Sequence, residues 1–333
     1  MPRPILIDTD TGVDDALALI VALRSPEVSV KAITTVAGNV EVEKCTRNVF
    51  RILRLLQLGE TPIVAQGAKK PLHRPLFSAP EVHGHDGLGN FLMRLPPTAK
   101  KNPRGAVDVI IESCRRYAGR LTIVAIGPLT NLARAWKKDR TALRQVGRIV
   151  SMGGAFHVPG NTGPVAEFNY FVDPEAAHIL LQSGLPMTVV PLDVTQQLVL
   201  MRKEVEYRAK RRASALASAI LLFTRPYMRY HKKAEGFDGA YLHDPIAVAA
   251  AIDRRLIQTR GVHVDVETSG SYTRGMTVAD FRARVPFKPK AYLRPRRMSL
   301  WLKPPAEKKP SVDIAVKIDR ERFLKLFHER LWM

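Results

Sequence analysis

Short apolar runs alternate with segments of helical periodicity along the first two thirds of the 333-residue chain. The strand-like runs are Ile5–Ile7, Val30–Val36, Pro62–Ala65, Leu121–Ile126, Val146–Met152 and Met187–Val190. Helical patterns lie between them, at 16–23, 48–56, 106–117 and in a helix that ends near Gly184. Because strands separated by helices form right-handed βαβ units, the sequence predicts an α/β, Rossmann-like fold with a mostly parallel central sheet flanked by helices.

The last third continues this pattern less regularly. It contains one or two basic helices over Glu204–Arg229, an Ala-rich helix opening at Asp244-Pro245, strands near Val262–Glu267 and Val312–Ile318, and a helix over Arg320–Leu331. There is no internal repeat and no clear linker, so we expect one large domain over residues 1–333. Residues 282–310 contain ten Lys/Arg, only one acidic residue (Glu307) and six prolines. We expect them to be a basic, Pro-rich excursion from that domain.

Four carboxylates follow the first strand within eight residues, at Asp8, Asp10, Asp14 and Asp15. In open α/β sheets ligands bind beyond the carboxyl ends of the strands. Acids this close repel one another unless a cation compensates them, and an all-oxygen donor set favours Ca²⁺ or Mg²⁺. We expect Gly12 to allow a tight turn that aims the acids at one point. The run therefore predicts a metal or substrate site.

Helix capping is the structural alternative, but capping uses one or two of the four acids. Two chemistries suit the run. In the first, a phosphatase of the haloacid dehalogenase type would use Asp8 as nucleophile and Asp10 as acid/base. In the second, a metal-bound water would hydrolyse the substrate.

The bulk composition limits the classes of protein further. Two cysteines, Cys45 and Cys114, are too few for a disulfide framework, and no secretory signal or long apolar segment is evident, so we expect a soluble, cytoplasmic protein that does not enter a membrane. The net charge of +21 could indicate nucleic-acid binding. No RNA- or DNA-binding motif accompanies it, so we expect no nucleic-acid partner and attribute the charge to a basic proteome or a solubilising surface.

The motifs, in their order, resemble those of the inosine–uridine preferring nucleoside hydrolase family. The run from Asp8 to Ala16 looks like its N-terminal signature. The later blocks are Thr34–Asn39, Ile126–Ala133, Met152–Gly154, Ala166–Asn169 with Asp173–Ala177, and His243–Pro245. Thr11 stands where that family usually has proline, which removes no ligand. The resemblance implies hydrolysis of the N-glycosidic bond of ribonucleosides, in nucleoside catabolism and purine or pyrimidine salvage.

The same resemblance implies a calcium site. Asp10, Asp15, Asp244 and the backbone carbonyl of Ile126 would bind Ca²⁺, and Asp10 would take the proton from the calcium-bound water as general base. Asn39 would lie near the same water and ion.

Ribose recognition is implied for a second set of residues. Asp14, Asn161, Glu167 and Asn169 would bind the ribose hydroxyls, which both donate and accept hydrogen bonds. If the segment were extended, Glu167 and Asn169 would share one face.

The nucleobase must depart, and protonation eases its departure. His243, beside a predicted metal ligand, would be the general acid. His83, in a flexible loop that reads His83-Gly-His-Asp-Gly87, would border the base pocket, with Phe168 and Met152 in apolar contact with the base. The aromatic stripe Tyr227, Tyr230 and His231 would either line the far side of the base or pack in the core.

Two alternatives remain open at this point: the phosphatase, and a non-catalytic protein that binds nucleosides or polyanions. The sequence does not decide base preference, the role of 282–310, or which residues close the base pocket. Family members are usually homodimers or homotetramers, so we expect one of these.

Overall fold

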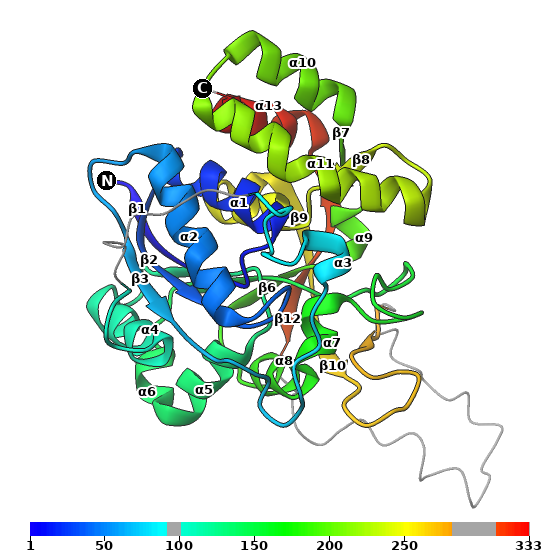
Figure 1. The fold of residues 1–333 in the computed structure, drawn as a ribbon. Coiled ribbons are helices and arrows are strands. Elements are labelled where there is room, and N and C mark those ends of the chain that lie inside the picture. The colour runs from blue at the N-terminus through cyan, green and yellow to red at the C-terminus, as the bar shows by residue number, and fades with distance from the viewer. Residues whose placement is uncertain (92–100, 282–310, 333) are drawn as a thin grey trace, which may run out of the picture.

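The centre of the computed structural model, which describes residues 1–91, 101–281 and 311–332, is an eight-stranded sheet (Figure 1). Its strand order is β3-β2-β1-β4-β5-β6-β12-β9. Every neighbouring pair is parallel except the last, β12 with β9. The strands are β1 Arg3–Thr9, β2 Val28–Thr35, β3 Ile63–Gln66, β4 Thr122–Ala125, β5 Arg148–Met152, β6 Met187–Val190, β9 Ile257–Val262 and β12 Val312–Ile318. The predicted α/β class with a mostly parallel sheet is confirmed.

Two small antiparallel pairs stand apart from this sheet. They are β7 (Val199–Met201) with β8 (Gly239–Tyr241), and β10 (Val264–Val266) with β11 (Thr277–Ala279).

The helices connect and cover these strands. They are α1 Val13–Leu23, α2 Val42–Leu56, α3 Pro80–His83, α4 Ala106–Arg116, α5 Thr130–Lys138, α6 Arg140–Leu143, α7 Phe168–Val172, α8 Pro174–Leu181, α9 Leu192–Thr195, α10 Arg202–Arg212, α11 Ala215–Glu235, α12 His243–Ile252, the 3₁₀ helix η1 Arg254–Leu256 and α13 Arg320–Trp332.

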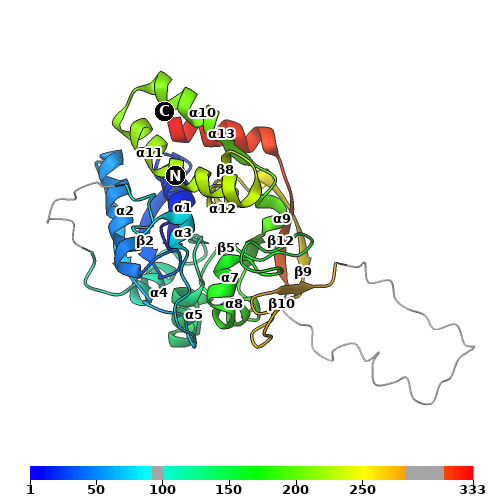
Figure 2. The same cartoon turned by 45° about the vertical axis from the view of Figure 1, so that its right-hand side comes forward.

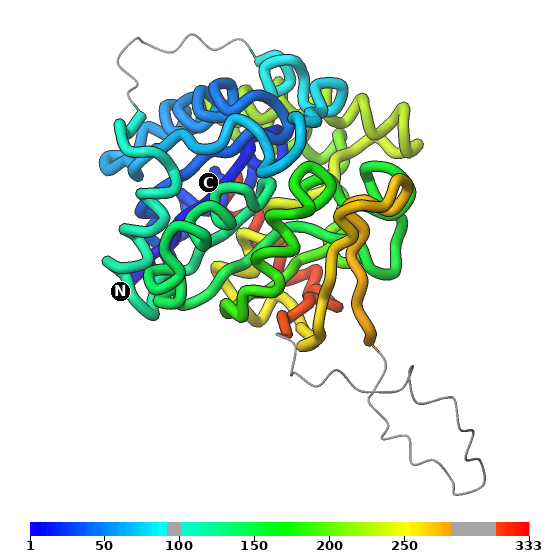
Figure 3. The backbone as a smooth tube through the Cα atoms, turned by 90° about the horizontal axis from the view of Figure 1, so that it is seen from below, coloured from blue at the N-terminus to red at the C-terminus, as the bar shows by residue number. Residues whose placement is uncertain are grey.

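The inner strands are apolar on both faces because helices cover both faces of the sheet. In β1, Ile5 and Ile7 face one core and Leu6 faces the other. The first core contains residues of α1, α2, α11, α12 and α13, and the second contains residues of α4, α5 and α8. Figures 2 and 3 show this layering from two further directions. Continuous apolar runs are the pattern expected of parallel strands buried in this way.

The strand order reverses between β1 and β4, and this reversal positions the site. From β1 the chain proceeds outward to β2 and β3, while β4, β5 and β6 extend to the opposite side. Asp8 pairs in register with Ala125, and the backbone N–H of Ile126 donates to the Asp8 carbonyl at 2.8 Å. A crevice forms where neighbouring strands lead their chains in opposite directions. The aspartate run after β1 and the Ile126 backbone after β4 therefore meet there.

Several predicted boundaries differ from the observed ones. The segment Glu204–Arg229 lies in two helices, α10 and α11, separated where Ala213 adopts a left-handed conformation (φ 38°) and Ser214 caps α11. The strand expected near Val262–Glu267 is divided between β9 and β10, which belong to different sheets. The basic excursion 282–310 lies outside the described residues. Across the parts of the chain that are described, no helix has the length and apolarity needed to cross a membrane.

Candidate active site

Carboxylates from three elements converge at the reversal point. Asp10 follows β1, Asp14 and Asp15 lie in the first turn of α1, and Asp244 lies in the first turn of α12. All four are buried, with at most 6% of any residue exposed. Oxygen atoms of Asp14, Asp15 and Asp244 lie within 4.8 Å of one another. Because α1 packs against α12, acids more than 200 positions apart in the sequence share one small volume.

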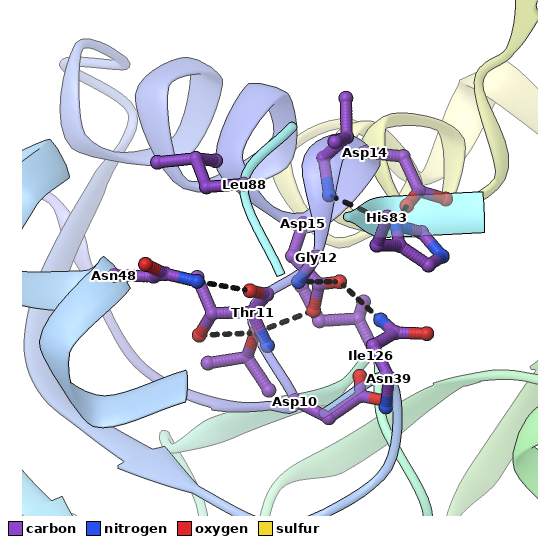
Figure 4. Close-up of polar contacts among 12 residues, drawn as sticks. Asp10, Thr11, Gly12, Asp14, Asp15, Asn39, Asn48, His83, Leu88 and Ile126 are labelled. Atoms are coloured by element: carbon purple, nitrogen blue, oxygen red, sulfur yellow. Dashed lines mark hydrogen bonds and ion pairs between the residues drawn. The ribbon is translucent and has the colours of Figure 1, made fainter. Parts of the chain in front are cut away.

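Asp10 is held on one side and open on the other (Figure 4). Its Oδ2 accepts a hydrogen bond from the backbone N–H of Asn39 at 2.7 Å, whereas its buried Oδ1 has no partner among the described residues. Two glycines leave room for this carboxyl group. A Cβ at Gly38 would lie 2.1 Å from Oδ2, and one at Gly127 would lie 2.8 Å from Oδ1.

Asp15 is fixed by several donors, which sets the entry of α1. Its Oδ2 accepts from the Gly12 backbone N–H at 2.8 Å and from the Asn39 side-chain amide at 3.2 Å, and its Oδ1 accepts from the Thr9 hydroxyl at 2.5 Å. Asp15 therefore caps its own helix, as the structural alternative proposed, but Asp10, Asp14 and Asp244 do not.

The reason predicted for Gly12 was wrong. Its backbone is extended (φ −86°, ψ −161°), a conformation that any residue can adopt. A Cβ there would lie 2.6 Å from both the Asn39 amide nitrogen and Nδ1 of His83. Glycine is required because two side chains approach the backbone closely, not because the turn is tight.

Burial and mutual repulsion disfavour the charged form of all four acids. The pKa of Asp14 is raised to about 8, first by burial and then by the charge of Asp15. Burial is also the main reason that the pKa values of Asp10, Asp15 and Asp244 are raised. Asp15 and Asp244 also influence each other, since Asp15 raises the pKa of Asp244 and Asp244 lowers that of Asp15. A cation among these carboxylates would remove the repulsion.

The donor set fits a hard divalent cation. It consists of carboxylate oxygens and the backbone carbonyl of Ile126, with one buried oxygen of Asp10 still unpartnered. Oxygen-only sites of this kind suit Ca²⁺ or Mg²⁺. The predicted ligands Asp15 and Asp244 belong to the closest group of acids, whose third member is Asp14.

A second group of polar side chains faces these acids from α7. Glu167 is the N-cap of this helix and accepts from the backbone N–H groups of Asn169 at 2.8 Å, Tyr170 at 3.1 Å and Gly154 at 3.1 Å. Burial raises the pKa of Glu167 to about 7. The condition for Glu167 and Asn169 to share one face, an extended segment, is therefore not met, because the chain turns into a helix immediately after Glu167.

Asn169 connects the two strand ends that border the site. Its side-chain amide donates to the carbonyl oxygens of Ile126 and Met152, both at 3.3 Å. The Oδ1 atom of Asn161 accepts from the backbone N–H of Phe168 at 2.9 Å. These contacts fix the loop and helix beside the acids.

One cavity joins the acids to this second group. Among its lining residues are most of the predicted site residues: Asp14, Asn39, His83, Ile126, Met152, Asn161, Glu167, Phe168, Asn169, His243 and Asp244. Asp10 and Asp15 are not part of the lining and lie buried beside it. Asp8 is also absent from the lining and fully buried, and its Oδ1 accepts from the side chains of Thr34 and Asn131. Besides burial, the charges of Asp15 and Asp14 raise the pKa of Asp10 but not that of Asp8, so Asp10 and not Asp8 interacts with the acids at the cavity. This argues against the phosphatase alternative, which needs Asp8 as nucleophile.

The His83 segment is more firmly held than the expected flexible loop. His83 ends α3, and its Nδ1 accepts from the Val13 backbone N–H at 3.1 Å. Asp86 accepts from the backbone N–H groups of Leu88 and Asn90, both at 2.8 Å, and from the Arg51 guanidinium at 2.9 Å.

His243 is fixed by a different partner. Its Nδ1 lies 2.7 Å from the hydroxyl of Thr195, at the end of α9. Burial, followed by the nearby His231 and His83, lowers the pKa of His243 to about 3.

Helix α11 and strand β8 form the far wall of the cavity. Tyr227, Tyr230 and His231 all line it, as one of the two alternatives for the aromatic stripe proposed, and Tyr227 also packs in the core. Sequence reasoning missed Glu235 and Tyr241, which line the same wall. The position of Glu235, one helical turn after His231, was the available signal.

Comparison with known proteins agrees with this geometry. The family model described as "Inosine-uridine preferring nucleoside hydrolase" matches residues 5–325. The "Pyrimidine-specific ribonucleoside hydrolase RihA" of Enterobacter sp. (strain 638) is 41% identical over 99% of this chain and 98% of its own. The protein of the same name from Escherichia fergusonii is also 41% identical, over 99% of each chain.

Solved structures share the whole fold. The plant nucleoside hydrolase PpNRh1 superimposes with a TM-score of 0.89 at 36% identity, over 100% of this chain and 99% of its own. The purine-preferring ribonucleoside hydrolase from Gardnerella vaginalis has a TM-score of 0.86 at 34% identity, over 99% and 98%.

Proposed function

The chain belongs to the inosine–uridine preferring nucleoside hydrolase family, and we propose that it is a calcium-dependent enzyme that converts ribonucleosides and water to ribose and free nucleobase. The observation that carries this proposal is the buried group formed by Asp14, Asp15 and Asp244 beside one cavity. Asp10 interacts electrostatically with this group, and its Oδ1 has no partner among the residues that the structure describes. Buried polar atoms are normally hydrogen-bonded, and a bound cation or a proton would satisfy this oxygen.

Asp10, Asp15, Asp244 and the carbonyl of Ile126 would hold the calcium ion. When bound, calcium would neutralise the acids and orient a water molecule and the ribose hydroxyls. The Oδ1 atom of Asp10 then takes the proton of the attacking water. Asn39 keeps the other Asp10 oxygen in place through its backbone N–H.

Asp14, Asn161, Glu167 and Asn169 would bind the ribose. Asp14 and Glu167 supply carboxylate oxygens that accept hydrogen bonds, and the two asparagines supply both donors and acceptors. This set matches ribose hydroxyl groups, which donate and accept hydrogen bonds. Cleavage of the C–N bond develops positive charge on the sugar, and buried carboxylates nearby stabilise that charge.

His243 is the proposed general acid for the departing base, a role that requires its pKa to rise above the value of about 3 that burial gives it in this structure. With Nδ1 engaged by Thr195, Nε2 is the ring nitrogen available to the substrate. His83, Met152 and Phe168 complete the wall against which the base would pack.

The names of the relatives point to both classes of base. The relatives at 41% identity are called pyrimidine-specific, and the solved structure at 34% identity is called purine-preferring. We propose uridine and cytidine as the first substrates on the strength of the higher identity. As the family resemblance implies, we also propose a homodimer or homotetramer, which light scattering after gel filtration tests.

The direct test incubates the protein with uridine, cytidine, inosine, adenosine and guanosine, with calcium present. Free base and reducing sugar should appear in equal amounts for at least one nucleoside. Binding without release of base would support the non-catalytic alternative, and phosphate release from nucleotides without free base would support the phosphatase.

A further inference from the structure

A series of ring contacts crosses the far wall of the cavity. His83 stacks on Tyr227 at 5.2 Å between ring centroids, and Tyr227 meets His231 edge-on at 4.6 Å. Tyr241 contacts His231 at 5.3 Å and His243 at 5.2 Å. His231 therefore lies in the middle of this wall, between His83 and His243. Only 5% of its surface is exposed.

His231 has a carboxylate partner on its own helix. Its Nδ1 lies 3.1 Å from Oε1 of Glu235, one turn further along α11. Burial and then Glu235 raise the pKa of the Tyr241 hydroxyl, to about 12. The Nε2 atom of His231 is buried and has no partner among the described residues, although the residue lines the cavity. A carboxylate at Nδ1 favours the imidazolium form, whose second N–H is then free to donate.

The other two cavity histidines lack this arrangement. Nδ1 of His83 accepts an N–H from Val13 and lies 4.0 Å from Asp14, beyond hydrogen-bond distance. Nδ1 of His243 is paired with a hydroxyl. Burial lowers the pKa of both to about 3. Burial also lowers the pKa of His231, but there the charge and hydrogen bond of Glu235 oppose the shift.

We propose that His231, supported by Glu235, is a second proton donor to the departing nucleobase, beside His243. The inference rests on the proposed function and deepens it. As the C1′–N bond breaks, its electron pair moves to the base, which takes the proton from Nε2 of His231. The water oxygen bonds to C1′ and its proton passes to Asp10. Solvent then returns a proton to His231 and removes one from Asp10, so that nucleoside plus water gives ribose plus base.

The charged and titratable groups around His231 come from four elements. Tyr227, Tyr230 and Glu235 are on α11, and Tyr241 is on β8. Besides burial, the charge of His231 in turn contributes to lowering the pKa of His83 on α3 and of His243 on α12. Of these groups Glu235 is the acid hydrogen-bonded to the ring, so replacing it should lower the pKa of His231.

The test compares His231→Gln and Glu235→Gln on uridine and inosine with the same variants on p-nitrophenyl β-D-ribofuranoside. Nitrophenolate leaves without a proton, so this substrate reports the ribose and calcium machinery alone. The matched control is His328→Gln, because Nε2 of His328 lies 3.0 Å from Glu204 in a histidine–glutamate pair outside the cavity.

For His231→Gln, kcat on any nucleoside that the unmodified protein cleaves should fall by about 10²-fold, the lower range for loss of a general acid. Rates on the nitrophenyl riboside should stay within about threefold of the unmodified protein, since no proton transfer to the leaving group is lost. For Glu235→Gln, the alkaline decline in nucleoside turnover should begin at lower pH, because a histidine with a lower pKa loses its proton earlier. His328→Gln should change neither substrate.

Equal loss on both substrates, or unchanged nucleoside rates in a folded His231→Gln protein, would overturn the inference. If the unmodified protein cleaved neither substrate, the proposed function itself would fail. These outcomes are distinct, because the first concerns the ratio of two rates and the second their absence.

Discussion

The backbone N–H of Asn39 donates to one oxygen of Asp10 at 2.7 Å, whereas the other oxygen of that carboxyl group has no partner among the described residues. The two oxygens of the Asp10 carboxyl group therefore have different roles. The bonded oxygen fixes the orientation of the carboxyl group, and the free oxygen is available to a ligand or a proton.

Replacing Asp10 by Asn should abolish most turnover while preserving the fold. The amide has nearly the same shape but is not a base, so kcat should fall by about 10²- to 10⁴-fold. The melting temperature without calcium should be unchanged or higher, because one of four mutually repelling buried acids is removed. Steady-state kinetics and thermal unfolding measure both effects, and near-normal turnover would remove Asp10 as the base.

The glycine beside Asp10 gives a second prediction. A Cβ at Gly38 would lie 2.1 Å from Asp10 Oδ2 and 2.9 Å from the Pro128 ring, so Gly38→Ala must displace the carboxyl group. We expect kcat/KM to fall by at least roughly tenfold, which corresponds to about 1.4 kcal/mol. Gly59→Ala is the matched control, since its Cβ would have no neighbour within 4 Å. Equal activity of the two variants would show that the space around Asp10 is not needed.

Features encoded locally were predictable from the sequence. The apolar runs indicated strands buried on both faces, and the acids after Ile7 indicated a site at the end of the first strand. Both inferences depend on residues that are neighbours in the chain, and the βαβ pattern then determines which strand ends meet.

Features that depend on packing between distant segments were not predictable. Gly12 was interpreted as a turn residue. The real reason for glycine is the close approach of His83, which is about 70 positions away in the chain and therefore could not be seen in the sequence. The sequence did not show that the Glu167 side chain caps the helix that follows it. Glu235 was missed because a glutamate on a basic helix looks like an ordinary solvated residue. Its side chain is indeed 36% exposed, and only the contact of its carboxylate with His231 and its place in the cavity lining distinguish it.

Removing calcium should destabilise the protein, and more so at higher pH. In the folded protein the pKa of Asp14 is raised to about 8, and the pKa values of Asp10, Asp15 and Asp244 are also raised. The pKa of Asp in an unfolded chain is about 3.9. The folded chain therefore binds more protons between about pH 4 and 8, so its stability declines as pH rises through that window.

In a chelator, the melting temperature should fall steadily from about pH 5 to pH 8, because these acids lose protons there. Calcium at about 100 times its Kd should add roughly 2.7 kcal/mol, and the pH dependence should become flatter. Thermal unfolding across pH with and without calcium tests this. A chelated protein whose melting temperature stays level or rises would contradict the prediction.

His243→Ala should affect natural nucleosides more than activated substrates. We expect about a 10²-fold or greater loss of kcat on the preferred nucleoside, as for other general acids. The nitrophenyl riboside should be cleaved almost normally, and the calcium concentration for half-maximal activity should not change. Thr195→Val, which retains the ring and removes its hydroxyl partner at 2.7 Å, should give an intermediate loss. Similar losses on both substrates would remove His243 as the acid.

Substitution of Asp8 is the most direct test between the hydrolase and the phosphatase alternative. It is fully buried, its Oδ1 accepts from the Thr34 hydroxyl at 2.5 Å and the Asn131 amide at 2.8 Å, and its Oδ2 has no partner among the described residues. Asp8→Asn retains an acceptor for both donors and removes a buried charge, although its new amide nitrogen lacks an acceptor.

Nucleoside turnover by Asp8→Asn should therefore remain within about tenfold of the unmodified protein, or about 1.4 kcal/mol of transition-state stabilisation. Burial raises the pKa of Asp8 to about 7, so its loss should also make the decline in stability between about pH 4 and 7 less steep. Activity assays and thermal unfolding across pH give the two readings. A loss of activity as large as that of Asp10→Asn would give Asp8 a role in the chemistry, as a nucleophilic aspartate requires. Retained activity, with a stability that depends less steeply on pH, would assign Asp8 a structural role beneath the site.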